Sequence, residues 1–515
     1  MLTGPGRCMP FEMAPPPAHA LVEALRGLGY NLWTAIADII DNSIAARAGT
    51  IRLDFGWEGG ASWIRVSDDG HGMDESELAQ AMRPGARNPL AARQPSDLGR
   101  FGLGLKTASF SQCRRLTVAS RRAGMPSACR VWDLDEIARH DEWRLRTEPM
   151  PSSAPLIQPL ESMPQGTIVL WEKLDRVVGT DADPMDRRAE DTFLRLAERT
   201  ERHLGMIFHR YLDAPGSPLR ILLNGDTQQN RVRPWDPFLE WHPATTRSPE
   251  ERLRDGETEV RVQGFVLPHR DRLDERSSEL GGGPEGWVSQ QGFYVYRNRR
   301  LLVPGDWLGL GHPRRWAKED AYRLARLRLD IPNSADAAWQ IDVRKSSASP
   351  PRALRGRLTD LAERVRADAR RVFLHRGSYG PRAPTPDLQR AWTAVERRDG
   401  VAYRIDRAHP VVAHALAEAG DAREGIEAML RVIEETVPVH RIWIETTERE
   451  GLAPTGFGSA PQAEVRTIAE ALFRDFTGRM GLSVESARSL LSRTEPFNGF
   501  PDLVANLGAH GKEHP

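Results

Sequence analysis

Cysteine is scarce in this chain of 515 residues. There are three, Cys8, Cys113 and Cys129, in no paired spacing. This argues against a disulfide framework and against a structural zinc site. Long apolar runs are also missing, because no stretch approaches the ~20 residues that span a bilayer. The N-terminus lacks the basic flank and apolar core of a signal peptide, so we expect a cytoplasmic protein without a membrane partner.

Net charge is absent as well, since Lys and Arg together number 71 and so do Asp and Glu. The chain as a whole is therefore not expected to bind polyanions, although local patches remain open. One segment, 344–382, holds eleven Lys or Arg against three acids. Such an excess is usually a solvated face, but phosphate contacts would suit it equally well. The length favours two to four domains.

Glycine is concentrated in the stretch 97–109, which reads DLGRFGLGLKTAS. Gly99, Gly102 and Gly104 let the backbone approach a ligand closely, and the run after them has no helix breaker. A glycine loop that opens a helix offers free N–H groups and a positive dipole end, which suit a phosphate chain. A flexible loop before an ordinary helix would look similar. The polar segment at 83–97 is typical of a lid over such a site.

The pattern from 19 to 48 predicts two helices with a break near 27–30. In the second helix, apolar residues recur at helical spacing, while Asp38 and Asn42 lie four residues apart on one face. Burying an unpaired carboxylate and a carboxamide is costly. Two interpretations stay open: a solvated helix edge, or an acid and a metal-binding amide in a nucleotide pocket.

Strands are predicted at 50–55 and 61–67, and the second ends in SDDGHGMD. Asp68 lies at the strand end, where a carboxylate can accept a hydrogen bond from an exocyclic amine. Gly70 and Gly72 form a tight turn that lets a flat ring lie against the backbone. A simple acidic turn would have the same sequence. Further strands are predicted at 115–120, 128–133 and 167–172.

These pieces, in this order, resemble the GHKL ATPases, which include gyrase-type topoisomerases, ninety-kilodalton heat-shock chaperones, histidine kinases, MutL and MORC. DIIDN resembles the E-x-x-x-N box, SDDGHGM the D-x-G-x-G box, GRFGLGLKTAS the glycine box at the lid end, and Gly166-Thr167 the late-strand Gly-Thr. The resemblance covers about residues 18–180. It implies a Bergerat-fold ATPase sandwich of the α/β class, in which a mixed sheet carries helices on one face.

The resemblance also implies ATP and Mg²⁺ as cofactors and assigns roles position by position. Asn42 would hold Mg²⁺ as its metal ligand, and Asp68 would bind the adenine amine, with Thr167 nearby. Gly70, Gly72 and Met73 would lie against the base. The phosphates would be cradled by the backbone of the glycine box, namely Gly99, Gly102, Leu103, Gly104, Leu105, Lys106 and Thr107.

One position departs from the family pattern. The water-activating base is usually Glu, whereas this chain has Asp38, whose side chain is one methylene shorter. Geometry comes first for a general base, so either the helix lies closer to the phosphate or hydrolysis is slow. Asp41 is a weaker substitute, because it lies one residue off the face of Asn42.

A second domain is expected at 183–378, after an N-terminal tail at 1–17 and the ATP-binding domain at 18–182. GFYVYRNRRLL at 292–302 resembles the MutL and MORC transducer, which implies an α/β, ribosomal protein S5-like fold. In that family a transducer cation reaches the γ-phosphate. Lys345 is our candidate and Arg344 its competitor, because both lie in a Ser-rich loop; a solvated surface lysine is the alternative.

Residues 379–515 are expected to be mainly helical and to bind a partner or mediate dimerisation, without chemistry of their own. The leading functional interpretation is an ATPase switch of the MutL/MORC type. It would dimerise through its N-terminal domains on ATP and contact duplex DNA through 344–382, alongside other proteins of a bacterial anti-phage defence, restriction or repair complex. A heat-shock-type chaperone and a non-hydrolysing ATP-bound scaffold remain as alternatives, whereas a histidine kinase and a complete type II topoisomerase fit poorly.

Overall fold

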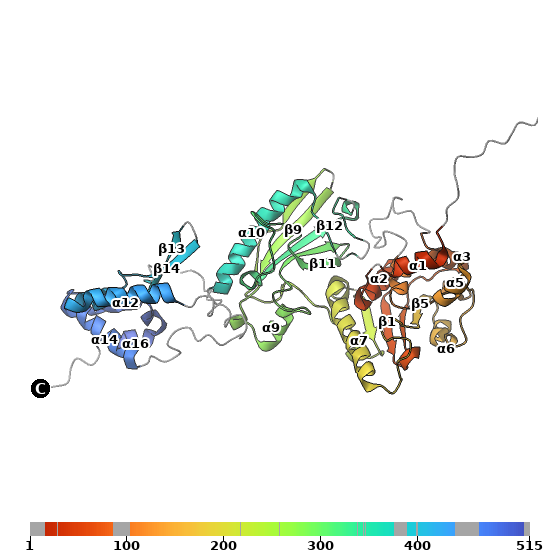
Figure 1. The fold of residues 1–515 in the computed structure, drawn as a ribbon, viewed down its shortest axis with the longest axis horizontal. Coiled ribbons are helices and arrows are strands. Elements are labelled where there is room, and N and C mark those ends of the chain that lie inside the picture. The colour runs from red at the N-terminus through yellow and green to blue at the C-terminus, as the bar shows by residue number, and fades with distance from the viewer. Residues whose placement is uncertain are drawn as a thin grey trace, which may run out of the picture. The chain divides into compact units, whose positions relative to one another are not determined.

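The structure is a computed structural model that describes residues 16–27, 29–85, 104–216, 218–256, 258–336, 338–342, 345, 347–374, 389–397, 400–437 and 463–508. The chain divides into two compact units, Met1–Ser378 and Tyr379–Pro515. The first unit contains two mixed or largely antiparallel sheets with helices packed on them (Figure 1). The prediction of a mixed α/β architecture is confirmed.

The first sheet has six strands in the order β4-β3-β5-β2-β1-β6. Neighbours pair antiparallel except β1 and β6, which run parallel. Its strands are β1 Thr50–Gly56, β2 Trp63–Asp68, β3 Arg115–Arg121, β4 Ala128–Asp133, β5 Gly166–Glu172 and β6 Arg220–Leu223. The helices of this part are α1 Ala18–Arg26, α2 Leu32–Ala45, α3 Glu75–Met82, α4 Gly104–Phe110, α5 Leu134–His140, α6 Ala154–Ile157, α7 Arg187–Ile207 and α8 His209–Leu212.

The sheet and its helices extend past residue 182, where we placed the end of the ATP-binding domain. The helix α7 packs on α2, and β6 completes the sheet beside β1. The first sheet therefore draws on residues up to 223.

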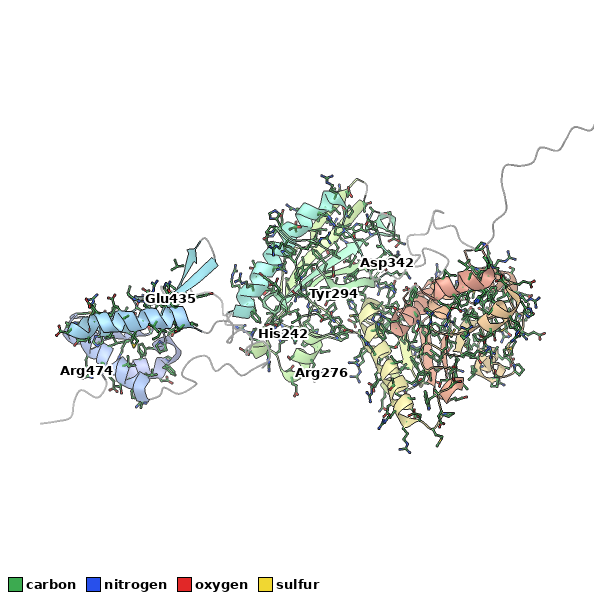
Figure 2. All side chains as sticks on the ribbon, in the orientation of Figure 1. His242, Arg276, Tyr294, Asp342, Glu435 and Arg474 are labelled. Atoms are coloured by element: carbon green, nitrogen blue, oxygen red, sulfur yellow. The ribbon has the colours of Figure 1, made fainter. Side chains whose placement is uncertain are left out.

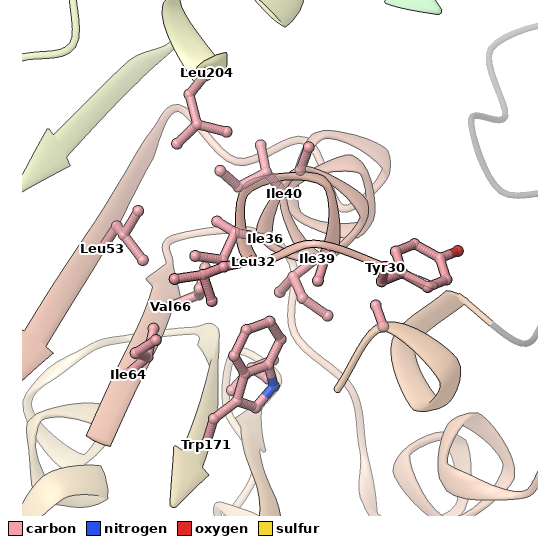
Figure 3. Packing of buried hydrophobic residues seen from close by; sticks show 14 of the residues in the cluster. Tyr30, Leu32, Ile36, Ile39, Ile40, Leu53, Ile64, Val66, Trp171 and Leu204 are labelled. Carbon is pink, nitrogen blue, oxygen red and sulfur yellow. The ribbon is translucent and has the colours of Figure 1, made fainter. Parts of the chain in front are cut away.

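The helix α2 carries the residues that matter most for the site. It begins after Asn31, whose side chain accepts a hydrogen bond from the Thr34 N–H at 2.9 Å and so caps the first turn. Its apolar side chains recur at the spacing of one helix face and pack on Leu53, Val66 and Trp171 of the sheet (Figure 3). This packing fixes the rotation of α2, so its acidic residues have a defined direction.

Ile36 is fully buried in this core. Replacing it with alanine is expected to lower the free energy of unfolding by ~3 kcal/mol, through lost burial and a residual cavity. Urea denaturation followed by tryptophan fluorescence measures the loss. Ile44→Ala, at a partly exposed position of the same helix, serves as the control and should cost clearly less. Equal losses at both positions would contradict the packing described.

The second sheet has the order β11-β10-β12-β9-β7, and β8 also pairs with β9. The strands β10 and β12 run parallel, and the other pairs are antiparallel. The helix α10 packs across β9 and β12 and buries a second apolar core. Figure 2 shows the side chains, with Tyr294 on β10 and Asp342 on the segment after the sheet. The elements are α9 Glu275–Gly282, α10 Arg352–Leu374, β7 Thr246–Arg247, β8 Glu251–Asp255, β9 Thr258–Val266, β10 Gly292–Arg297, β11 Arg300–Asp306 and β12 Ala325–Ile331.

The second unit, taken by itself, has a hairpin and helices around a small apolar core. Its described elements are β13 Trp392–Arg397, β14 Gly400–Ile405, α11 Pro410–Glu418, α12 Arg423–Thr436, α14 Ala463–Gly478, α15 Val484–Leu491 and α16 Pro501–Asn506. The strand that we considered at 439–446 lies outside the described residues. Across the described part of the chain, no helix combines the length and the apolar character needed to cross a bilayer.

Candidate active site

Strand β2 ends in a buried carboxylate, Asp68, for which the described residues provide no ion pair. One oxygen accepts a hydrogen bond from the Ser43 hydroxyl at 2.7 Å, and the other accepts one from the Gly70 N–H at 2.9 Å. Burial raises the pKa of Asp68. Holding a carboxylate in this setting is costly for folding, and a ligand N–H donor would supply a further partner.

The turn after β2 packs tightly against β3. Gly72 has a φ of +64°, and a Cβ there would lie 1.9 Å from a main-chain oxygen of β3, so only glycine fits. The Met73 N–H donates to the Ser120 hydroxyl at 2.8 Å. That hydroxyl also lies 2.8 Å from the hydroxyl of Thr167, which pairs with Asp68 across β2 and β5. The turn, Thr167 and Asp68 thus form one connected polar group.

A second polar group projects from α2, where Asp38 and Asp41 lie three residues apart on one face. Their residues are only 4% and 2% exposed. The Tyr30 hydroxyl donates to Asp38 Oδ2 at 2.9 Å. A Cβ on Gly104, the first residue of α4, would lie 3.9 Å from the same oxygen. The described end of the glycine box therefore adjoins Asp38.

Two cations from the second sheet region neutralise these acids. The Lys345 Nζ lies 2.6 Å from Asp41 Oδ2 and 3.1 Å from Asp38 Oδ1. The Arg300 Nε lies 2.8 Å from the Asp41 carboxylate, and one terminal nitrogen lies 3.5 Å from Asp38 Oδ1. We call these four residues, Asp38, Asp41, Arg300 and Lys345, the charge cluster. All four belong to the buried residues of the first unit.

The two acids of the charge cluster differ in proton affinity. Burial raises the pKa of Asp38, and the Asp41 charge adds to this effect, while Lys345 and Arg300 oppose it. Burial acts in the same sense on Asp41, but Arg300 and Lys345 outweigh it and hold the pKa of Asp41 below its ordinary value. Burial also raises the pKa of the Tyr30 hydroxyl, which stays a donor. Asp38 is therefore the better proton acceptor of the two.

The donor set also fits a magnesium nucleotide. Asn42 is exposed, and its Nδ2 donates to the main-chain oxygen of Asp38 at 3.1 Å. No donor to its Oδ1 occurs among the described residues, so that oxygen is available as the hard ligand that Mg²⁺ prefers. The Asp68 group likewise offers an acceptor for an amine. Both residues stay predictions for these roles.

The remaining residues of the glycine box are only partly described. Thr107 is fully buried, and the Lys106 ammonium donates to the Ala81 carbonyl of α3 at 2.8 Å. Leu105 is half-buried. Gly99, Gly102, Leu103 and the competitor cation Arg344 lie outside the described residues.

Sequence reasoning missed several members of the two polar groups. Ser43 and Ser120 gave no signal, because isolated serines are common. Arg300 lies within the segment that we compared with MutL and MORC, yet we gave it no role. From the sequence, Asp41 is the weaker candidate base because it lies off the Asn42 face, but at i, i+3 from Asp38 it reaches the same cations. The i, i+3 spacing was the available signal.

The basic helix α10 is less free than its composition indicated. Arg357 and Arg364 pair with Glu251 of β8 at 3.0 and 2.9 Å. Arg366 is buried with its guanidinium over Trp307, Trp316 and Tyr322 at 4.7, 4.5 and 3.7 Å from their ring centroids. Arg352 and Arg370 are exposed. Arg357, Arg364 and Arg366 are thus already engaged by residues of the same unit.

Comparison with known proteins relates the part of this site before residue 168 to a known family. Residues 30–167 match the family described as histidine kinase-, DNA gyrase B- and HSP90-like ATPase. The matched stretch contains the three acids of the two polar groups, Asp38, Asp41 and Asp68, and ends at Thr167.

Curated proteins similar to the chain include DNA mismatch repair proteins MutL. That of Rhodospirillum rubrum is 30% identical over 200 residues, which are 39% of this chain and 28% of the relative. That of Tolumonas auensis is 30% identical over 281 residues, 52% of this chain and 40% of the relative. That of Coxiella burnetii is 34% identical over 100 residues, 19% of this chain and 17% of the relative. The chain thus matches less than half of the length of each.

Proposed function

Since residues 30–167 form a GHKL ATPase domain close to that of MutL proteins, we propose that this chain is an ATP-hydrolysing conformational switch that acts on DNA. One observation carries the proposal: Lys345, from the segment after the second sheet, reaches the acids of α2 in a buried contact. Because Lys345 follows the second sheet in the chain but contacts α2 beside the first sheet, a change at the nucleotide site can alter how the second sheet packs on α2.

Each residue has a distinct task in this proposal. Asp68 accepts the adenine amine hydrogen bond, and Thr167, which pairs with Asp68 across β2 and β5, lies beside it. Asn42 would hold Mg²⁺, and the magnesium-bound ATP would supply the activated phosphoryl group; the negative charge of its γ-phosphate is what Lys345 would recognise. Lys345 exchanges its carboxylate partners for the γ-phosphate. Asp38, released from Lys345 but still held by the Tyr30 hydroxyl and close to Arg300, accepts a proton from the attacking water.

The exchange at Lys345 would also change the domain arrangement. In the proposal, the ATP-bound domains of two copies pair, and exposed arginines of α10 such as Arg352 and Arg370 contact duplex DNA. The second unit would bind partner proteins. We propose DNA repair, restriction or anti-phage defence in bacteria as the biological setting, and the similarity to proteins named for mismatch repair supports the first of these.

Measuring ATP turnover with and without duplex DNA tests the proposal. We expect DNA to raise the turnover several-fold at low salt, with the stimulation lost at high salt because phosphate contacts are screened. Arg352→Glu combined with Arg370→Glu should remove the stimulation and spare basal turnover. Arg254→Glu, at an exposed site of β8, is the matched control.

Two other outcomes would reject this function. Tight ATP binding without turnover would leave the chain as an ATP-bound scaffold, consistent with the occupied carboxylate of Asp38. Turnover unaffected by DNA, together with suppression of client aggregation, would instead identify a chaperone of the heat-shock type.

A further inference from the structure

The charge cluster contains more than the single cation that the proposed function requires. Arg300 has a side chain that is only 4% exposed, and its two acidic partners are 3% and 2% exposed. A buried guanidinium is stable only when it is paired well. Arg300 makes its shorter contact with Asp41 and its longer one with Asp38. It is thus placed chiefly against the acid that is not the proposed base.

The two cations, Arg300 and Lys345, lie in different kinds of backbone structure. Arg300 is the first residue of β11 and pairs with Arg297 across the β10–β11 hairpin. Asn298 and Arg299 turn this hairpin with φ values of 47° and 69°. The Asn298 side chain donates a hydrogen bond to the Asn333 side chain at 3.0 Å. The main-chain carbonyl of Asn298 accepts a hydrogen bond from the Tyr211 hydroxyl. The hairpin tip is therefore fastened at several points.

Lys345, in contrast, lies in irregular structure between the sheet and α10. Its φ is +53°, a left-handed conformation that is unfavourable for a residue with a side chain. Its N–H donates to the Asp342 carbonyl at 3.1 Å. Of the two cations, Lys345 is the one with a left-handed backbone, whereas Arg300 lies in a strand.

Departure of Lys345 would leave two buried carboxylates with one cation. Carboxylates this close repel each other strongly in a buried setting. Arg300 is already in contact with both and needs no movement to neutralise Asp41. Its Phe208 neighbour, 5.8 Å from the guanidinium, helps to keep it in place.

We infer that Arg300 is a positioning residue of the ATPase site, which holds Asp41 and this turn of α2 in place while Lys345 moves to the γ-phosphate. The inference rests on the proposed function and adds a division of labour to it. Lys345 is the exchangeable cation, and Arg300 is the fixed one.

The first test needs no ATP and uses thermal unfolding of the full chain. Lys345→Met should lower the melting temperature less than Arg300→Met does. When Lys345 is absent, Arg300 still contacts both Asp38 and Asp41 and can neutralise them. Arg300→Met combined with Asp41→Asn should recover much of the loss, since the unpaired acid is gone. A greater loss for Lys345→Met than for Arg300→Met, or no recovery in the double variant, would overturn the inference.

The second test separates positioning from simple stability. Well below the melting temperature, Arg300→Met should lower kcat at least ~10-fold through misplacement of α2, with the Kd for a non-hydrolysable ATP analogue nearly unchanged. Arg300→Lys should restore part of kcat. Arg299→Met, at the exposed neighbour in the same turn, is the control. Unchanged kcat in Arg300→Met would refute the positioning role, whereas absent turnover in the wild type would refute the proposed function instead.

Discussion

Replacing Asp38 with asparagine is expected to lower the rate of ATP hydrolysis ~10²–10⁴-fold, the usual contribution of a general base. The amide keeps the size of the side chain but has little proton affinity. ATP binding should persist and can become tighter. In the variant Lys345 gives up only its contact with Asp41, and no longer one with a charged Asp38, when it moves to the γ-phosphate. Single-turnover hydrolysis and titration with a non-hydrolysable ATP analogue measure the two effects separately.

The charge cluster dictates the controls for this experiment. Asp38→Asn leaves two cations against one acid in a buried place, so some loss of stability is expected. Turnover must therefore be measured well below the melting temperature of the variant. Asp38→Glu restores the carboxylate and should retain turnover within ~10-fold, while Glu142→Gln, at a side chain 62% exposed, should match the wild type. Normal turnover in Asp38→Asn would remove Asp38 as the base.

The second large effect concerns recognition of the base. Asp68→Asn should weaken ATP binding ~100-fold, because a charge-assisted hydrogen bond of up to ~3 kcal/mol is lost at a buried position. The folded protein should be no less stable than the wild type, since burial disfavours this carboxylate and the described residues give it no ion pair. Calorimetric titration with ATP and a thermal melt without ATP give both quantities.

A matched variant distinguishes recognition from general damage to the pocket. Ser43→Ala removes one hydrogen-bond donor to Asp68 at 2.7 Å but leaves the carboxylate, so ATP binding should fall by ~10-fold or less. Retained affinity in Asp68→Asn would exclude Asp68 from adenine binding. Equal affinity of the wild type for ATP and GTP would also count against an adenine-specific contact.

The sequence allowed most of the first sheet and α2 to be predicted, because local patterns decide them. The alternation before Asp68 and the helical spacing of Ile36, Ile39 and Ile40 are short-range signals. The resemblance to a nucleotide-binding family was recognised from short motifs and from their order along the chain. These are the parts of a fold that neighbouring residues determine.

The charge cluster depended on information that local patterns do not hold. Arg300 and Asp41 are 259 positions apart in the chain, and only the packing of the second sheet region on α2 brings them together. Lys345 was predictable only through resemblance to a family. The charge of α10 misled for a related reason, since counting arginines does not reveal that Arg357 and Arg364 share Glu251.

The parallel pairing of β1 with β6 has a consequence for biosynthesis. Thr50 and Arg220 are hydrogen-bonded through their side chains although 170 positions separate them. During translation the edge of β1 that pairs with β6 stays unpaired until the ribosome has released residue 223. An unpaired strand invites association with other nascent chains. A shortened gene that stops at codon 182 would make that exposure permanent, so expression trials of the nucleotide-binding part alone should extend beyond β6.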